Sequence, residues 1–186
     1  MRIIAGTAKG TRLTAPTGRE VRPTLDRVRE ALFSILMSRI EGVRFLDLFA
    51  GTGANGVEAL SRGAASATFV DNDPRSLELV RRNLEAARLA EHGQVRRLEL
   101  PKGLATLARE GTTYGIVFAD PPYGFAKENP QAYGNLIEAA SDARIAADGA
   151  LFVIEHDSRV ILPDSAGFFA RVRTAKYGET ALSIFS

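Results

Sequence analysis

Four consecutive residues, Asp120, Pro121, Pro122 and Tyr123, form the stretch of this sequence that is best suited to chemistry. They follow a short apolar run at residues 114–119, which predicts a buried strand. Two prolines cannot continue a strand ladder, so the strand must end where the carboxylate occurs. Asp120 is therefore expected at the carboxyl end of a strand, the edge at which open α/β sheets bind their ligands.

The chemistry that this stretch supports is recognition of a planar amine. The Asp120 carboxylate and the Pro121 carbonyl can each accept a hydrogen bond from the amine, which orients the nitrogen and stabilises positive charge developing on it. Tyr123 can stack on an unstacked base, a contact worth about 1–3 kcal/mol. We predict Asp120, Pro121 and Tyr123 as catalytic residues acting on the exocyclic amine of a nucleobase, without a choice between guanine, adenine and cytosine.

A second candidate site is the glycine-rich stretch at residues 47–56, between a predicted strand and the helix after it. Gly51, Gly53 and Gly56 fit the G-x-G-x-x-G spacing, and Asp71 ends the next predicted strand 20 residues after Gly51. Glycines let the backbone approach a ligand closely, and the acidic residue can accept hydrogen bonds from ribose hydroxyls. Together they predict a nucleoside-containing cofactor.

The charges near the glycine loop distinguish between two classes of cofactor. A dinucleotide needs its pyrophosphate at the amino terminus of the helix, where Asp47 would repel it. S-adenosylmethionine has no phosphate, and its ammonium and sulfonium groups favour nearby carboxylates such as Asp47 and Asp120. The pattern therefore favours S-adenosylmethionine, although an NAD-dependent oxidoreductase would share the glycine loop and Asp71.

The rest of the sequence predicts the elements that position these residues. From residue 43 onward strands and helices alternate, which indicates a largely parallel sheet covered by helices on both faces. Strands are predicted at residues 43–49, 67–71, 95–100, 114–119 and 150–155, and helices at 52–61, 74–88, 103–109 and 131–144. An antiparallel hairpin is predicted at residues 169–185, and a short N-terminal hairpin at 2–13 precedes a helix at 24–40.

Basic side chains are concentrated at the amino terminus. The first 40 residues carry eight basic and three acidic residues, whereas the remaining chain carries 16 basic and 19 acidic ones. Such a segment indicates a polyanionic partner or, equally, a solvated basic surface. Arg29 falls at the edge of the apolar face of the predicted helix, so its guanidinium either forms a structural ion pair or reaches a ligand.

Length and composition narrow the class of protein. The 186 residues, 45% of them hydrophobic, suit one globular domain, and no apolar run is long enough to span a bilayer. The chain has no cysteine and only two histidines, which excludes disulfides and thiolate metal sites. We expect a cytoplasmic protein without a structural metal.

Several motifs together resemble a known family. The glycine loop at residues 47–53, Asp71 and the Asp-Pro-Pro-Tyr stretch at 120–123 resemble class I amino-methyltransferases. Four further stretches narrow the resemblance to the bacterial 16S ribosomal RNA guanine-N2 methyltransferases: residues 2–6, 22–30, 60–64 and 177–180. The similarity extends over nearly the whole chain, and its motifs occur in the family's order.

The resemblance implies a Rossmann-like class I methyltransferase fold of the α/β class. A seven-stranded, mostly parallel sheet with an antiparallel C-terminal hairpin is expected, within one domain. Residues 1–41 would form an RNA-facing hairpin and helix, and residues 42–186 the catalytic core that binds S-adenosylmethionine. The implied reaction methylates the N2 amine of a guanine in 16S rRNA, within an assembled or partly assembled small ribosomal subunit. We expect the enzyme to act as a monomer.

The predicted binding residues follow from the motifs and from this resemblance. The cofactor-binding set is Asp47, Phe49, Gly51, Gly53, Asp71, Asn72 and Leu104, and the RNA-binding set is Lys9, Arg12, Arg22, Arg29 and Phe125. Residues 99–103 lack the polar residue that related enzymes place near adenine, so backbone groups near Leu104 are expected there instead. A DNA adenine or cytosine amino-methyltransferase is the main alternative, although 186 residues leave little room for a target-recognition region.

Overall fold

The computed structural model describes residues 1–16, 23–122, 124–127 and 129–186, without the side chains of residues 23–25. The chain divides into two compact units, Met1–Arg97 (unit 1) and Leu98–Ser186 (unit 2). The expected division into an extension and a core at residue 41 stays a prediction. Across the parts of the chain that the structure describes, every helix is too short or too polar to cross a lipid bilayer.

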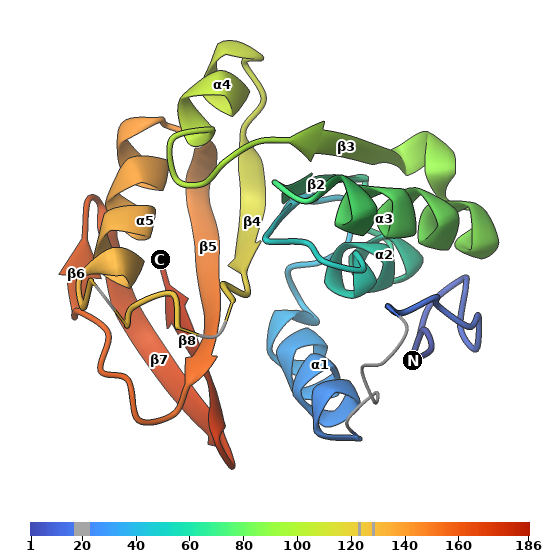
Figure 1. Cartoon of the computed structure of the whole chain (residues 1–186), viewed down its shortest axis with the longest axis horizontal. Coiled ribbons are helices and arrows are strands. Elements are labelled where there is room, and N and C mark those ends of the chain that lie inside the picture. The colour runs from blue at the N-terminus through green and yellow to red at the C-terminus, as the bar shows by residue number, and fades with distance from the viewer. Residues whose placement is uncertain (17–22, 123, 128) are drawn as a thin grey trace. The chain divides into compact units, whose positions relative to one another are not determined.

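Unit 1 is a parallel three-stranded sheet with helices packed on it (Figure 1). Its elements are α1 (Pro23–Leu36), β1 (Arg44–Leu48), α2 (Ala54–Ser61), β2 (Ser66–Asp71), α3 (Pro74–Ala87), η1 (Ala90–His92) and β3 (Gly93–Arg97). The strand order is β3-β2-β1, with α2 and α3 side by side against the sheet. β3 begins and ends earlier than the strand predicted at residues 95–100, because the chain turns again before Gly103.

One glycine lets α2 approach this sheet closely. A Cβ on Gly56 would lie 2.3 Å from Cε1 of Phe69, which is fully buried in β2. Real side-chain atoms do not approach so closely, so only glycine fits at this position without displacing the helix. Gly56 therefore serves helix–sheet packing, whereas Gly51 and Gly53 shape the loop with positive φ values, and Gly53 also lies close to Val80 and Phe69.

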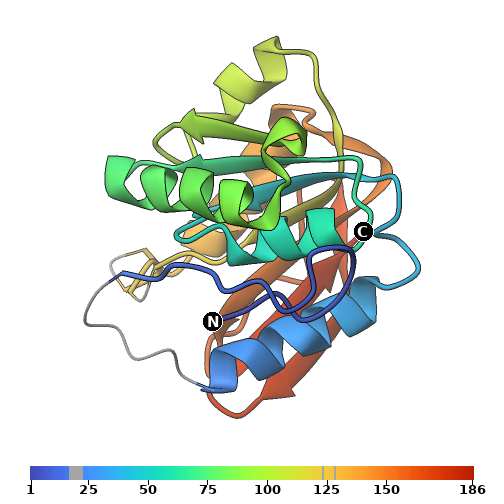
Figure 2. The ribbon, with the colours of Figure 1, turned by 90° about the vertical axis from the view of Figure 1, so that its right-hand side faces the viewer.

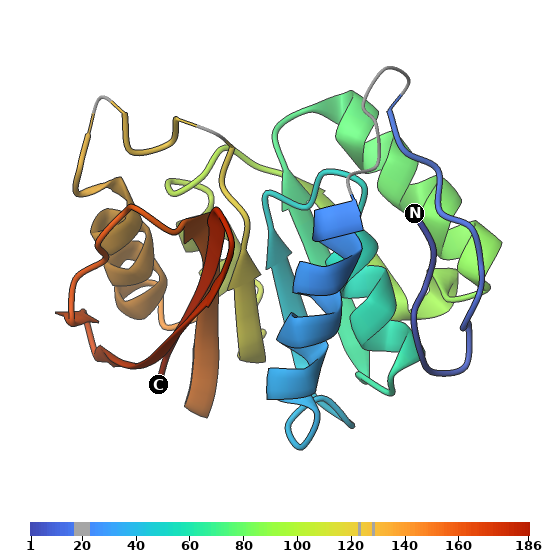
Figure 3. The same cartoon turned by 90° about the horizontal axis from the view of Figure 1, so that it is seen from below.

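Unit 2 contains two parallel strands continued by an antiparallel hairpin, with α5 along one face (Figures 1 and 3). Its elements are α4 (Leu104–Arg109), β4 (Tyr114–Ala119), α5 (Ala132–Asp142), β5 (Ala146–Asp157), β6 (Ser165–Ala166), β7 (Phe169–Tyr177) and β8 (Thr180–Phe185). β4 and the C-terminal hairpin are confirmed at the predicted positions, and the α/β fold class is confirmed. The two-residue β6 has no sequence signal, because its pairing with β7 depends on a chain reversal.

The first 16 residues, here called the arm, form a hairpin with only one strand-like bridge. Arg2 pairs with Arg12, and the Ile3 N–H donates to the Thr11 carbonyl over 3.0 Å. The predicted N-terminal hairpin therefore exists without regular strands. The reason is that other backbone groups of the arm bond to helices instead of to one another, and Figures 2 and 3 show the arm passing along α2 and α3.

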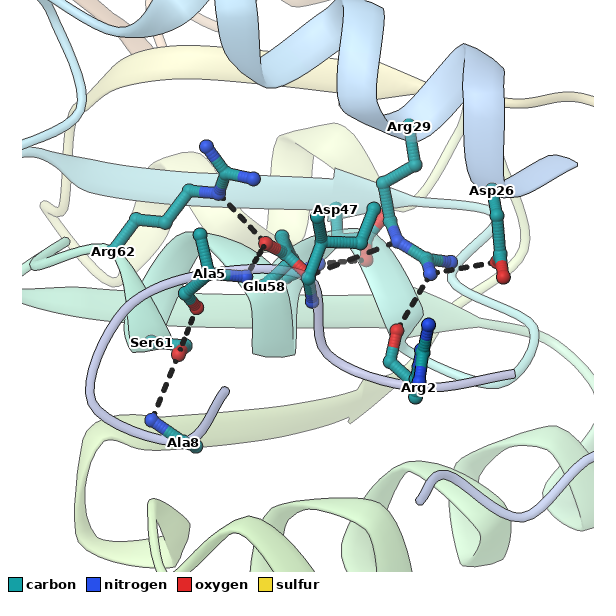
Figure 4. A network of polar contacts seen from close by, with 11 residues as sticks. Arg2, Ala5, Ala8, Asp26, Arg29, Asp47, Glu58, Ser61 and Arg62 are labelled. Carbon is teal, nitrogen blue, oxygen red and sulfur yellow. Dashed lines mark hydrogen bonds and ion pairs between the residues drawn. The ribbon is translucent and has the colours of Figure 1, made fainter. Parts of the chain in front are cut away.

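A buried carboxylate on α2 fixes the first part of the arm (Figure 4). Glu58 is fully buried and accepts hydrogen bonds from the backbone N–H groups of Ile4 and Ala5, at 2.8 and 3.0 Å. Arg62 also donates to this carboxylate, over 2.7 Å. Ser61 adds two more bonds, accepting from the Ala8 N–H and donating to the Ala5 carbonyl. The arm is therefore part of the packed unit.

Gly6 lies where the arm comes closest to α2. Its φ of +86° is in the left-handed region, and an added Cβ would lie 1.7 Å from the Ser61 carbonyl oxygen. Gly10 has nearly the same φ, +87°, but an added Cβ there would meet no atom within 4 Å. The two glycines therefore share a backbone conformation and differ in steric surroundings.

We predict that Gly6→Ala destabilises the protein more than Gly10→Ala does. Both substitutions cost about 1 kcal/mol through the positive φ, but Gly6→Ala also forces the arm away from α2. Loss of two or three hydrogen bonds, each worth about 1 kcal/mol, should add at least 1 kcal/mol to its cost. Urea unfolding of the two variants measures the difference; equal destabilisation would show that the contact with Ser61 does not hold the arm.

Candidate functional site

The loop between β1 and α2 has a backbone shaped for close contact with a ligand. Three of its residues, Phe49, Gly51 and Gly53, have positive φ values of 60°, 54° and 74°. Glycine adopts this conformation freely, whereas Phe49 is in a sparsely populated region whose strain costs about 1–3 kcal/mol. Such strain is concentrated at ligand-binding sites, and Phe49 thus supports the predicted cofactor loop without testing the contact itself.

Asp71 joins this loop to the end of β2. Its Oδ2 accepts a hydrogen bond from the Gly51 N–H and its Oδ1 accepts one from the Asp73 N–H, both at 2.9 Å. Asp73 in turn caps α3 by accepting from the Arg75 N–H. Two residues 20 positions apart are therefore brought into contact, as the spacing predicted. Asn72, between the two aspartates, is exposed beside them.

Asp47 has a structural partner in this loop. Its side chain is 2% exposed, and its Oδ2 accepts a hydrogen bond from the Gly56 N–H in the first turn of α2, at 2.9 Å. A buried carboxylate requires such donors, and the amino end of a helix favours a negative charge. Asp47 therefore fixes the loop to the helix, and its contact with the cofactor ammonium stays a prediction.

The residues of unit 1 fit a nucleoside-containing cofactor. A Cβ on Gly51 would meet only the Phe49 carbonyl oxygen, at 3.9 Å, so the space above this glycine is open. The half-exposed Asp71 carboxylate lies beside it and can accept hydrogen bonds from hydroxyl groups. An open backbone surface and an adjacent carboxylate acceptor fit the ribose end of such a cofactor.

In unit 2, Asp120 directly follows β4, as predicted from the two prolines. Solvent reaches its side chain, but the protein atoms crowded around the carboxylate desolvate it and raise its pKa to about 6. Within the described part of the chain the carboxylate has no hydrogen-bond partner. Pro121 is buried behind it, and Tyr123, predicted to stack on the base, lies outside the described residues.

Aromatic side chains support the segment that follows Asp120. Tyr133 on α5 is 6% exposed and packs edge-to-face on Phe125, with ring centroids 5.3 Å apart. Burial raises the pKa of Tyr133, and the negative charges of Asp120 and Asp157 raise it further. The contact between Tyr133 and Phe125 depends on how α5 packs, which sequence spacing does not show.

His156 continues this cluster into the C-terminal strands. Its ring lies 6.0 Å from that of Tyr133, and its Nε2 is 2.9 Å from the Ser183 Oγ on β8. Burial lowers the pKa of His156, so the neutral ring is favoured. With only 7% of its surface exposed, His156 is a packing residue.

A hollow of about 470 Å³ lies in unit 2 beside the predicted base-binding loop. It is lined by Pro101, Gly124, Phe125, Lys127, Asn129, Ala132 and Asn135. Phe125, predicted to contact RNA, is therefore at an accessible surface. Leu104 is not: its side chain is 1% exposed, so any contact with the cofactor must come from its backbone.

The predicted RNA-binding residues of unit 1 separate into two groups. Lys9 and Arg12 are exposed on the arm, where they are available to phosphate, and Arg22 lies outside the described residues. Arg29 is 4% exposed and donates to the Asp26 carboxylate and the Arg2 carbonyl, both at 2.8 Å. The RNA contact expected for Arg29 is therefore corrected to a structural role, because its guanidinium is enclosed between α1 and the arm.

We predict that Asp120→Asn stabilises the folded protein in a pH-dependent way. The pKa of this carboxyl rises from its ordinary value of 3.8 to about 6 on folding, so ionisation disfavours the folded state. The difference in the free energy of unfolding between the variant and the wild type should be absent below pH 4, grow between pH 4 and 6, and then level off. About 1 kcal/mol is expected after allowance for solvent screening. Urea unfolding at several pH values measures it; an advantage that shrinks as pH rises would contradict the raised pKa.

Comparisons with known proteins place this chain in a family. The family model described as Conserved hypothetical protein 95 matches residues 1–186. Ribosomal RNA small subunit methyltransferase D of Escherichia coli strain K12 is 35% identical over 187 residues, covering 100% of this chain and 89% of that protein. A solved structure of a hypothetical protein from Thermus thermophilus has a TM-score of 0.81 and 31% identity, covering 99% of this chain and 98% of that one.

A second relative agrees over a shorter span: ribosomal RNA small subunit methyltransferase D of Haemophilus influenzae is 34% identical over 125 residues, covering 67% of this chain and 65% of that protein. The class I methyltransferase fold expected from the motifs is confirmed by the solved structures, and the resemblance seen in the sequence is confirmed at the level of the family. This chain belongs, over its whole length, to the family described as Conserved hypothetical protein 95, whose relatives include methyltransferases of small-subunit ribosomal RNA.

Proposed function

We propose that this protein transfers a methyl group from S-adenosylmethionine to the N2 amine of a guanine in 16S rRNA. The observation that carries the proposal is Asp120, a carboxylate without a hydrogen-bond partner in the described chain, held at a strand end in front of two prolines. Membership of the family supports the reaction class, and the names of two relatives support ribosomal RNA as the substrate.

The residues of unit 1 hold the cofactor in this proposal. Asp71 accepts hydrogen bonds from the ribose, and the bare backbone around Gly51 provides the surface against which the cofactor lies. Asp47 fixes the loop through the Gly56 N–H, so the loop keeps its shape when the site is filled. S-adenosylmethionine, when bound, supplies an electrophilic methyl group.

Asp120 and Pro121 orient the accepting amine. The guanine amine is a poor nucleophile because its lone pair is delocalised into the ring, so its nitrogen must be aligned and its developing charge stabilised. With a pKa of about 6, Asp120 is ionised at neutral pH and accepts a hydrogen bond from the amine. The chain has no cysteine, which agrees with direct transfer without a covalent enzyme intermediate.

The arm supplies the basic surface for RNA. Lys9 and Arg12 are exposed on a segment that is fixed to α2 and α3 by backbone hydrogen bonds, so their charges are held at a defined place. A rigid basic segment suits a folded RNA more than a flexible tail does. The substrate in this proposal is the small ribosomal subunit or an assembly intermediate in the cytoplasm, and the enzyme acts as a monomer.

The proposal predicts one pattern of methyl transfer. Incubation with labelled S-adenosylmethionine and unmethylated small subunits, free 16S RNA or duplex DNA should label RNA-containing substrates only. Mapping of the labelled nucleotide should identify N2-methylguanine. Labelling of DNA on adenine or cytosine would favour the DNA amino-methyltransferase, and binding of NAD with no methyl transfer would favour the oxidoreductase.

We predict that Asp120→Ala lowers kcat by at least about 100-fold while leaving the affinity for S-adenosylhomocysteine nearly unchanged. The substitution removes a preorganised acceptor, a loss that typically costs on the order of 10²–10³ in rate. In the wild type, kcat/KM should rise with pH through about 6 and then level off, because protonated Asp120 has no negative charge to stabilise the positive charge developing on the amine and is a weaker hydrogen-bond acceptor. Near-normal methylation by the variant would refute the assignment.

A further inference from the structure

Asn83 is a buried polar residue on the apolar face of α3. It is fully buried in a row whose other buried members are Leu77, Val80, Leu84 and Ala87. A polar side chain at such a position costs free energy unless its donors and acceptors are bonded, and leucine would suit the packing better. Its presence requires a reason other than helix–sheet packing.

The amide of Asn83 bonds to two segments that are far apart in the sequence. Its Oδ1 accepts a hydrogen bond from the Thr14 N–H at 2.7 Å, and its Nδ2 donates to the Thr14 carbonyl at 3.1 Å. The same Nδ2 donates to the Thr52 carbonyl at 2.8 Å. Both donors and the acceptor of the amide are therefore used on backbone groups.

These two segments are the ones that the proposed function assigns to different ligands. Thr52 lies between Gly51 and Gly53 in the cofactor loop, whereas Thr14 ends the fixed part of the arm. Beyond Thr14 the sequence continues to the basic residues Arg19 and Arg22. One rigid side chain thus spans the cofactor loop and the arm within a single compact unit.

The other residues that hold the arm do not bond to the cofactor loop. Glu58 and Ser61 bond to residues 4–8 of the arm, and their hydrogen bonds go to the arm and to Arg62 rather than to the cofactor loop. They hold the arm on α2 whether or not the loop moves. A change in the loop therefore reaches the arm through Asn83, because this residue bonds to both backbones.

We propose that Asn83 is a positioning residue that couples the cofactor loop to the arm, so that cofactor and RNA bind cooperatively. This inference rests on the proposed function. A ligand that fixes the position of the Thr52 carbonyl fixes the Asn83 amide, which in turn fixes both backbone groups of Thr14. Because coupling is reciprocal, RNA bound to the arm must raise the affinity for the cofactor by the same factor.

The test is a binding cycle with S-adenosylhomocysteine and unmethylated small subunits. In the wild type, saturating S-adenosylhomocysteine should tighten subunit binding by about 5-fold or more, within the usual range of allosteric coupling. Asn83→Ala should reduce this factor to nearly 1. Ser76→Ala, a neutral change on the same helix, is the matched control and should keep the wild-type factor.

A second variant separates coupling from folding. Thr14→Pro removes the N–H that donates to Asn83 but leaves Asn83, Thr52 and the cofactor loop unchanged. It should retain wild-type affinity for S-adenosylhomocysteine alone and show a weaker effect of S-adenosylhomocysteine on subunit binding, because only the bond from Asn83 Nδ2 to the Thr14 carbonyl remains. If Asn83→Ala does not fold, Thr14→Pro decides the question.

Hydrogen exchange gives a readout that needs no RNA. Addition of S-adenosylhomocysteine should slow exchange of the arm amides at Ile3 and Thr14 about threefold or more in the wild type, and have no such effect in Asn83→Ala. A wild-type coupling factor in either variant, or none in the wild type, overturns the inference while leaving the proposed function standing. Failure of the wild type to bind S-adenosylhomocysteine or subunits overturns both.

Discussion

The buried carboxylate of Glu58 is the interaction on which the N-terminal half of the protein depends. It accepts two backbone N–H groups of the arm and pairs with Arg62, and the Arg29 Nε lies 3.8 Å from its Oε2. These contacts hold α1, α2 and the arm together. Removing one partner from a buried charge costs about 3–5 kcal/mol. The contacts of Glu58 explain why the arm has a fixed position on α2 although it lacks regular strands.

The two units use their carboxylates differently. In unit 1, Asp47, Glu58 and Asp71 each accept backbone N–H groups, and these bonds shape the cofactor loop and attach the arm. In unit 2, Asp120 has no such donor in the described chain, and desolvation of its carboxylate raises its pKa. A carboxylate without a structural donor is what the proposed contact with a substrate amine requires, because its acceptor atoms are not used by the fold.

Local sequence patterns predicted much of the fold because their physical causes are local. The two prolines after Asp120 end β4, Asp73 caps α3 before Pro74, and the spacing from Gly51 to Asp71 follows from one strand–helix–strand repeat. Patterns failed where long-range contacts decided the outcome. The N-terminal hairpin lacks regular strands because α2 and α3 supply its hydrogen-bond partners.

The sequence by itself predicted the reaction class and the candidate cofactor loop, and it located the candidate catalytic carboxylate at the end of β4, because residue type and spacing carry that information. Only the tertiary structure showed which polar side chains are already used in hydrogen bonds and ion pairs within the protein. Arg29 could be read from its helical position as an RNA contact or as an ion pair, and burial beside Asp26 assigned it to the structure. Asn83 gave no signal in the sequence, since its three hydrogen bonds go to backbone groups 69 and 31 residues away. Hydrogen bonds to distant backbone leave no local pattern, so they become visible only when the chain is folded.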